Sequence, residues 1–380
     1  YTCFPMRRFL LCFVILLTAC TPVVDSLLKS QVQESYNAAE HWFLGQIRED
    51  KGLFNYLYQP ESDTYSSSNN AIRQLMAAKL LADISIERPQ WRVQHERNLR
   101  FIMQYWYKED GKVGYIFYDD KSKLGANALA LRLIIASPLY EQYAEQAEML
   151  YLGIISLMDE DGSLEPWFIE PDYEYDTDYL LTFYSGEALL ALAEYAEKTR
   201  RSDVMQATIK SQDFYIDRYI NNMDQYYYPA YVPWHTQSLS VLYDVTGDPK
   251  YIDAIFTLTD KVLELQATSG KFIGRFYNPA TPQYGNPHSS SDGVYTEGIA
   301  YAYAKARSLG YAQRAQRYKT SLEIAVQNLI SLQYDNASAA VFPHSKKAIG
   351  GLRTKHTKTG MRIDCTQHTM DAYRKLLEVL

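Results

Sequence analysis

The chain has 380 residues, of which 47% are hydrophobic and 22% charged, and its formal net charge at pH 7 is -7. This composition predicts a folded core and excludes a disordered or fibrous chain. The acidic balance disfavours nucleic acid as a partner, because the chain lacks a general basic field. Tyrosine is unusually frequent, at 34 residues, which favours a surface on which an amphipathic ligand stacks.

The N-terminal residues have the pattern of a secretory signal, with two arginines ahead of an apolar run over residues 9–17 that is too short to span a bilayer. Leu-Thr-Ala-Cys at residues 17–20 resembles the lipobox of bacterial lipoproteins, in which the cysteine carries the lipid. We therefore expect a signal peptide over 6–19, a lipid on Cys20 and a tether over 20–30. Threonine follows the cysteine, as in outer-membrane lipoproteins of Gram-negative bacteria, so we expect attachment to the outer membrane. An ordinary signal peptide is the alternative.

Cysteine usage and missing motifs exclude several chemistries. With the signal removed and Cys20 acylated, Cys365 is the one cysteine left, so neither a disulfide framework nor a cysteine metal site is expected. The sequence contains no phosphate-binding loop, dinucleotide fingerprint, His-Glu-x-x-His or Gly-x-Ser-x-Gly motif. We expect no metal and no cofactor.

Apolar residues recur with helical spacing in twelve segments, and no series of strands competes with them. One type of segment is long, with charges on one face, as at 141–148; the other is shorter and rich in small residues, as at 186–193. Since a helix that is apolar all round is buried and a helix with one apolar stripe lies outside, the alternation predicts an inner and an outer ring. The expected helices are 28–49, 69–84, 91–107, 124–136, 139–157, 184–198, 203–221, 235–246, 250–267, 295–308, 311–333 and 366–379.

The connections alternate as well. Links from inner to outer helices are brief, as at 246–249 and 308–310, whereas the opposite links are long and hold most of the aromatic, Gly, Pro and His residues. Long structured loops in a compact domain are usually functional, and these should share one rim above the N-termini of the inner helices. The pattern predicts an all-α fold, an (α/α)6 toroid, over residues 31–380. The long links are 56–70, 115–123, 167–183, 226–234, 275–295 and 343–362.

This organisation resembles the six-hairpin glycosidases and the sugar epimerases and lyases that share their barrel. The resemblance implies a carbohydrate-active enzyme with its cleft over the inner ring. Terpenoid-cyclase-like toroids have the same outline, but they usually enclose an apolar cavity, and the loops of this chain are too polar for that.

Two expected helix starts carry acidic residues. Glu187, with Tyr184 just before it, is placed near free helical amides, which would lower its pKa and suit a base or an electrostatic stabiliser. His288, Asp292, Tyr295 and Glu297 fall within ten residues, and Asp-Gly-Val-Tyr-x-Glu-Gly is similar to helix-opening acidic motifs of six-hairpin carbohydrate enzymes. The structural alternatives are helix-dipole complementation and capping.

The last long link is basic. Between residues 336 and 363 there is no acidic residue, which favours an anionic ligand, bound by Arg353 and Arg362, over a merely solvated loop. Its six cations are Lys346, Lys347, Arg353, Lys355, Lys358 and Arg362.

The segment that follows enters the last inner helix. Asp364 and Gln367 have the spacing of a capping box. His368 is either a buried neutral histidine or a catalytic one. Arg-x-Asp-x-x-x-His at 362–368, with the region from 184 to 191, is similar to glucuronyl C5-epimerases, a resemblance that implies deprotonation and reprotonation of a uronic acid unit.

Aromatic residues surround the start of the fourth inner helix. Trp234 and His235, beneath Tyr231, would hold a pyranose by stacking and hydrogen bonding; a packed tyrosine-rich loop is the alternative.

These patterns together predict a lipid-anchored envelope enzyme that acts on an acidic polysaccharide. Hydrolysis requires two carboxyl groups, with Glu187, Asp292, Glu297 and Asp364 as candidates. In epimerisation or elimination a tyrosine or histidine moves the proton and an arginine, Arg353 or Arg362, stabilises the enolate; the candidates for the proton transfer are Tyr184, Tyr295, His235 and His368. The competing hypothesis is a non-catalytic glycan-binding or polysaccharide-export lipoprotein with a degenerate toroid.

Overall fold

The computed structural model describes the backbone of residues 11–380 and the side chains from Ser26 onward. The start of the predicted signal peptide and the side chain of Cys20 lie outside these described residues. Residues 20–30, the predicted tether, belong to helix α1 (Leu11–Leu44), and Leu28 and Val32 are already buried. Packing on the barrel therefore begins inside this segment. In the part of the chain that the structure describes, no helix has the length and apolar character needed to cross a membrane.

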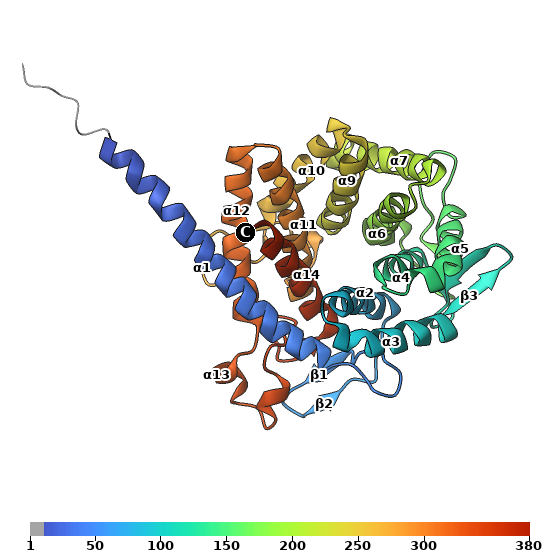
Figure 1. The fold of residues 1–380 in the computed structure, drawn as a ribbon, viewed down its shortest axis with the longest axis horizontal. Coiled ribbons are helices and arrows are strands. Elements are labelled where there is room, and N and C mark those ends of the chain that lie inside the picture. The colour runs from blue at the N-terminus through green and yellow to red at the C-terminus, as the bar shows by residue number, and fades with distance from the viewer. Residues whose placement is uncertain (1–10) are drawn as a thin grey trace, which may run out of the picture.

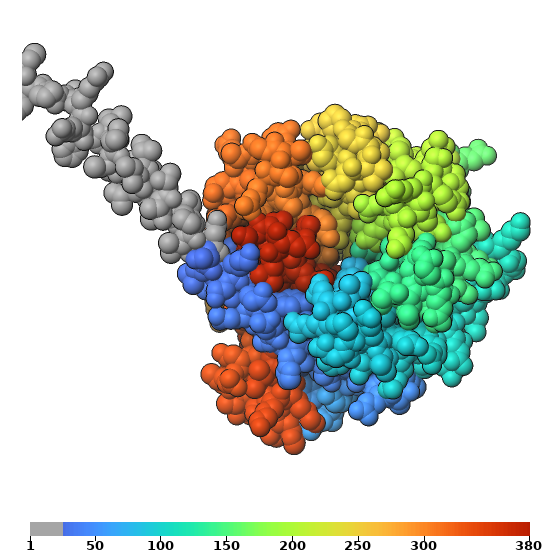
Figure 2. Space-filling view, in the orientation of Figure 1, coloured from blue at the N-terminus to red at the C-terminus, as the bar shows by residue number. Residues whose placement is uncertain are grey.

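Twelve helices of residues 11–380 form two concentric rings (Figure 1), which confirms the predicted (α/α)6 toroid. Each inner helix packs against the next, and the last packs against the first, so the ring is closed. The space-filling view shows the described part of α1, coloured blue, lying against the C-terminal helix, coloured red (Figure 2). The inner helices are α2 (Ala71–Glu87), α4 (Leu124–Ala136), α6 (Thr177–Thr199), α9 (Val232–Thr246), α11 (Ser289–Ser308) and α14 (Ile363–Val379). The outer helices are α1, α3 (Arg92–Tyr105), α5 (Ala144–Ile155), α7 (Ser202–Ile216), α10 (Pro249–Val262) and α12 (Ala312–Leu332).

The ring that a helix joins follows from its side chains. Helix α4 is made mostly of small and apolar residues, and every position from Leu124 to Ile134 is buried. Helix α10 buries one stripe, which includes Tyr251, Ile255 and Leu258, and leaves its other face to solvent. The hydrophobic effect therefore sorts helices without a polar face inward and helices with one apolar stripe outward.

Glycines let the inner helices approach one another closely. A Cβ on Gly186 of α6 would lie 2.5 Å from the Cβ of Trp234 on α9, and a Cβ on Gly293 of α11 would lie 2.9 Å from the Cβ of His368 on α14. Both distances are too short for a side chain. These two glycines thus allow the approach that brings Trp234 and His368 toward the centre of the ring.

Long links join outer to inner helices at one end of the barrel, as predicted, and short links join inner to outer helices at the other. The long links carry short strands that the sequence analysis did not predict, and these strands form four antiparallel pairings in three small sheets. β1 (Leu57–Gln59) pairs with β2 (Thr64–Tyr65) and with β7 (Met361–Arg362), which ties the first link to the last. The other pairs are β3 (Tyr107–Asp110) with β4 (Val113–Ile116) and β5 (Ser122–Lys123) with β6 (Trp167–Ile169). Two short helices, α8 (Met223–Tyr226) and α13 (Asn336–Ala339), also lie in links.

Four inner helices, α6, α9, α11 and α14, begin earlier than predicted, because residues ahead of the predicted apolar periodicity are also helical. The Asp176 carboxylate caps α6 by accepting a hydrogen bond from the Tyr179 amide, and the His288 ring caps α11. Helix α9 begins at Val232, three residues before its predicted start. Glu187 and Glu297 therefore lie in or near the third turn of their helices, and the prediction that placed them among free helical amides was wrong.

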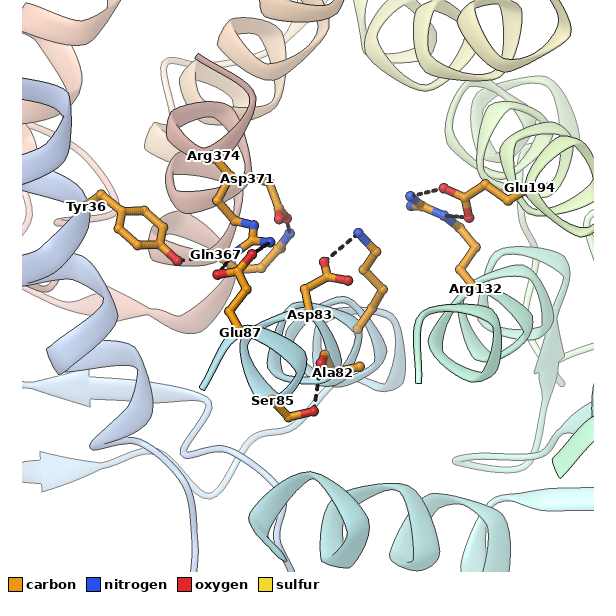
Figure 3. Close-up of polar contacts among 11 residues, drawn as sticks. Tyr36, Ala82, Asp83, Ser85, Glu87, Arg132, Glu194, Gln367, Asp371 and Arg374 are labelled. Atoms are coloured by element: carbon orange, nitrogen blue, oxygen red, sulfur yellow. Dashed lines mark hydrogen bonds and ion pairs between the residues drawn. The ribbon is translucent and has the colours of Figure 1, made fainter. Parts of the chain in front are cut away.

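The C-terminal halves of the inner helices carry paired charges. Arg132 of α4 donates two hydrogen bonds of 2.8 Å to Glu194 of α6, and the two side chains face each other across neighbouring helices (Figure 3). Lys79 pairs with Asp83 at 2.9 Å on α2. Charges buried in such pairs compensate one another.

Candidate active site

A pocket of about 330 Å³ opens at the N-terminal ends of the inner helices, where the long links meet. All six inner helices, or the residues that cap them, contribute to its wall. The pocket brings together six of the predicted site residues from four helices: Tyr184, Glu187, Trp234, Tyr295, Asp364 and His368.

Glu187 is a buried carboxyl group of the pocket wall, with 3% of its surface exposed. Its Oε2 atom has no hydrogen-bond partner and lies over Gly125 of α4, where a side chain would overlap it. Burial raises the pKa of Glu187 to about 8, against a weaker opposing effect of the Arg132 and Lys123 charges. The predicted lowering of this pKa was wrong, because desolvation outweighs the helix dipole three turns into α6. At neutral pH Glu187 is a proton donor.

His368 lies in the pocket wall beside Glu297. The Nδ1 atom of His368 is 3.6 Å from Oε2 of Glu297, and both atoms are buried without a hydrogen-bond partner. The His368 ring packs edge-on against Trp234, with centroids 5.9 Å apart. Glu297 itself does not line the pocket. Its carboxylate is placed to orient the imidazole, and His368 is the group of the pair that can exchange a proton with a ligand.

Asp364 is held by two arginines. It accepts hydrogen bonds of 2.6 and 2.7 Å from Arg362 and one of 2.9 Å from Nε of Arg73. Burial opposes ionisation of Asp364, but the hydrogen bonds and charge of Arg362, with the charge of Arg73, lower its pKa to about 2. The predicted capping box does not form, because Asp364 faces the arginines and Arg362 occupies the N-cap position. Asp364 therefore anchors Arg73 and is a poor base.

Aromatic rings form the rest of the wall. Tyr184, Trp234 and Tyr295 are buried except where they face the pocket, and Phe183 and Tyr179 extend the wall along α6. Burial raises the pKa of both Tyr184 and Tyr295, so their hydroxyl groups stay protonated and can donate hydrogen bonds. Rings interspersed with donors suit a pyranose.

Two predicted site residues, one on α9 and one in the turn that precedes it, do not line the pocket. His235 is buried between helices, where its Nε2 atom is 3.2 Å from Oγ of Ser185 and its Nδ1 atom 3.1 Å from Nε2 of Gln212. Burial lowers the pKa of His235 to about 3, so it is neutral. Tyr231 is fully buried and stacks on Tyr219 at 3.8 Å. Neither is placed to bind a substrate in the pocket.

Three further predicted site residues make contacts that hold the links and helices together. Asp292 accepts hydrogen bonds from the Phe276 amide at 2.8 Å and from Asn328 at 2.9 Å, so it ties a link and α12 to α11. His288 caps α11 through Nδ1. Arg353 packs over a tyrosine and donates to main-chain carbonyls at the end of α12.

The basic link does not present all its charge to the pocket. Lys347 pairs with Asp63 at 2.8 Å, and Arg362 is committed to Asp364. None of the six predicted cations is among the residues that line the pocket. In the described part of the chain, no group of three His, Cys, Asp or Glu side chains is placed to hold a metal ion.

Two cations that the sequence analysis missed do line the pocket. Arg73 lies in the first turn of α2 and also donates to the Tyr56 hydroxyl at 2.6 Å, while Lys123 precedes α4 and lies 5.7 Å from the centre of a tryptophan ring. Both follow long links and directly precede or begin inner helices, the position at which the sequence analysis placed its other candidates. With Glu187 protonated, Arg73 and Lys123 against Asp364 give the residues that line the pocket a charge of 2 - 1 = +1, in a chain whose net charge is -7.

Comparison with known proteins confirms the barrel. No family model matches the sequence, and no curated protein matches it closely enough to count as a relative. Solved structures do match. D-mannose isomerase has a TM-score of 0.70 at 11% identity over 93% of this chain and 98% of its own. Cellobiose 2-epimerase from Bacillus thermoamylovorans has a TM-score of 0.69 at 12% identity, over 94% of this chain and 100% of its own. An unsaturated glucuronyl hydrolase specific for heparin has a TM-score of 0.62 at 10% identity, over 93% of this chain and 98% of its own. The chain thus has the six-hairpin fold of sugar isomerases, epimerases and glycosidases.

Proposed function

We propose that this protein is a carbohydrate-active enzyme that acts on an anionic glycan in the pocket at the N-terminal ends of its inner helices. The observation that carries the proposal is the pairing of a buried, protonated acid, Glu187, with an imidazole, His368, in the same ring-lined pocket. A proton donor and a proton acceptor in one water-restricted site are the components of general acid–base catalysis.

The charge of the pocket supports an acidic substrate. Lys123 forms no ion pair with an acid among the described side chains, and Arg73 is held in place by Asp364. A uronate carboxylate in this pocket would meet two positively charged donors, and a neutral sugar would leave Lys123 without an anionic partner.

Proton transfer at carbon fits the geometry better than hydrolysis. Two carboxyl groups line the described pocket, and one of them, Asp364, has its oxygens bound by arginines. Hydrolysis needs a second carboxylate that is free to act. For a uronate, His368 would take the proton beside the carboxylate, the electron pair of the broken C–H bond would move into an enolate stabilised by Arg73, and Glu187 would return a proton. Protonation on the other face gives epimerisation, and loss of the neighbouring glycosidic oxygen gives elimination.

Product analysis tests the proposal and separates the reaction classes. Purified protein is incubated with neutral and uronate-containing oligosaccharides in deuterated water. Deuterium at the carbon beside the carboxylate indicates epimerisation, a new conjugated double bond indicates elimination, and new reducing ends without either indicate hydrolysis. Binding without any product would favour the non-catalytic glycan-binding alternative.

We also propose that the protein is a lipoprotein of the outer membrane, anchored through Cys20. The support is the sequence pattern of residues 17–20. Mass spectrometry of the protein from a Gram-negative host should find acyl chains on Cys20 and none in Cys20→Ser; an unmodified wild-type cysteine would contradict the anchor.

A further inference from the structure

A second, smaller cleft of about 210 Å³ lies next to the pocket, across the first turn of α11. Ser290 and Ser291 face the pocket, while the two residues before them, His288 and Ser289, line the cleft. A chain of sugar units that leaves the pocket over the start of α11 would enter this cleft.

The cleft is lined by cations without acidic partners. Arg275 and Lys355 form no ion pair in the part of the chain that the structure describes. The guanidinium of Arg275 packs on Phe272 at 4.4 Å, and its Nε atom is buried without a hydrogen-bond partner. Because Arg275 lines the cleft and pairs with no acid, its guanidinium is a charged donor available to a ligand with an acceptor oxygen.

The acid in the cleft wall does not supply that oxygen. Asp292 uses one carboxylate oxygen for the Phe276 amide and the other for Asn328. Asn328 in turn accepts a hydrogen bond of 2.9 Å from Nε2 of His356. Asp292 therefore holds the imidazole of His356 in the wall through Asn328, and each of its carboxylate oxygens already accepts a hydrogen bond from the frame.

A histidine adds a further donor. Nδ1 of His288 accepts a hydrogen bond of 3.1 Å from the Ser290 amide, so the proton of the neutral ring is on Nε2. The cleft thus combines a guanidinium, an ammonium and an N–H donor beside the start of a helix, and this combination matches an oxyanion.

We propose that this cleft binds the acidic group, a carboxylate or a sulfate ester, of a second sugar unit when an oligosaccharide occupies the pocket. The inference rests on the proposed function and adds that the preferred substrate is an oligosaccharide with acidic groups on more than one unit. Free monosaccharides do not reach both sites.

Binding measurements with matched ligands test the cleft. Isothermal titration uses a glucuronate-containing tetrasaccharide, its sulfated form, its carboxyl-reduced neutral form and methyl glucuronide. In Lys355→Ala, we expect the affinity for the tetrasaccharide with the preferred acidic group to fall roughly tenfold, because a charge-assisted hydrogen bond is lost. The carboxyl-reduced form and methyl glucuronide should bind as they do to wild type. The acidic form that loses more affinity identifies the group.

The matched control is Lys358→Ala, which removes an exposed cation of the same link outside the cleft. Equal effects of Lys355→Ala and Lys358→Ala on the acidic tetrasaccharides would overturn the cleft proposal and leave the proposed function intact. Binding of no glycan to wild type would instead overturn the proposed function. Arg275→Gln, checked for folding by circular dichroism, must reproduce the selective loss seen in Lys355→Ala; a loss that extends to the neutral form would contradict an anion site.

Discussion

Replacement of Glu187 by glutamine separates its chemical role from its effect on stability. The folded pKa of about 8 lies above the ordinary value of 4.5, so the folded state holds the proton more tightly than the unfolded chain. Wild type therefore loses stability from this group as the pH rises from 4.5 to 8, by about 1.4 kcal/mol per pH unit. Glutamine does not ionise, so the variant does not lose this stability as the pH rises. The free energy of unfolding of Glu187→Gln minus that of wild type should therefore increase by about 3 kcal/mol from pH 5 to pH 7.

Activity should change in the opposite direction. At pH 7 about 90% of Glu187 is protonated by this pKa, so most molecules hold the donor proton that glutamine lacks. Loss of one general acid typically lowers the rate by about 10² to 10⁴, or about 3–5 kcal/mol in the barrier.

Urea unfolding from pH 5 to 8, with turnover of the active glycan, measures both effects. Glu197→Gln, an exposed change on the same helix, is the control for general effects of charge removal. A stability difference between Glu187→Gln and wild type that does not vary with pH, or full activity in the variant, would refute the assignment of Glu187 as a buried proton donor.

Three further substitutions test the frame of the site. In Gly125→Ala the new methyl group overlaps the Glu187 carboxyl, so we expect a loss of about 1–3 kcal/mol of stability and of most activity; wild-type turnover would show that the carboxyl lies elsewhere. Arg362→Ala leaves Asp364 with a single arginine and should cost up to about 2.4 kcal/mol at pH 7, since the pKa of Asp364 falls from 3.8 to about 2 and each pH unit is worth about 1.4 kcal/mol. Because the pKa of Asp364 is lowered from 3.8 to about 2, this stabilisation is present above pH 3.8 and lost as the pH falls to 2, so unfolding curves of variant and wild type should converge there and not run parallel. His368→Ala removes the imidazole that lies 3.6 Å from the Glu297 carboxyl, and the variant should retain its circular dichroism spectrum and lose about 10²- to 10⁴-fold in rate; a smaller kinetic effect would remove His368 from the mechanism.

The sequence predicts a site residue correctly where its position near the start of an inner helix is enough to place it in the pocket. Trp234, Tyr295 and His368 lie near the starts of inner helices that follow long links, and all of them reach the pocket. Tyr231 and His235 belong to the same stretch as Trp234 but turn away from the pocket, because a helix points successive residues about 100° apart. Which face of α9 is directed toward the pocket depends on how α9 packs against neighbouring helices that are distant in the sequence.

The sequence by itself determined the architecture. Three local patterns predict one closed double ring. They are the apolar periodicity, the alternation of fully buried helices with helices that bury one face, and the alternation of long and short links. Charge and protonation in the pocket were decided by the tertiary structure alone. Arg73 reaches Asp364 across 291 residues of sequence, and the proton of Glu187 is retained because packed helices remove water from its carboxyl. Desolvation and long-range ion pairs are properties of the assembled ring, so no local pattern encodes them.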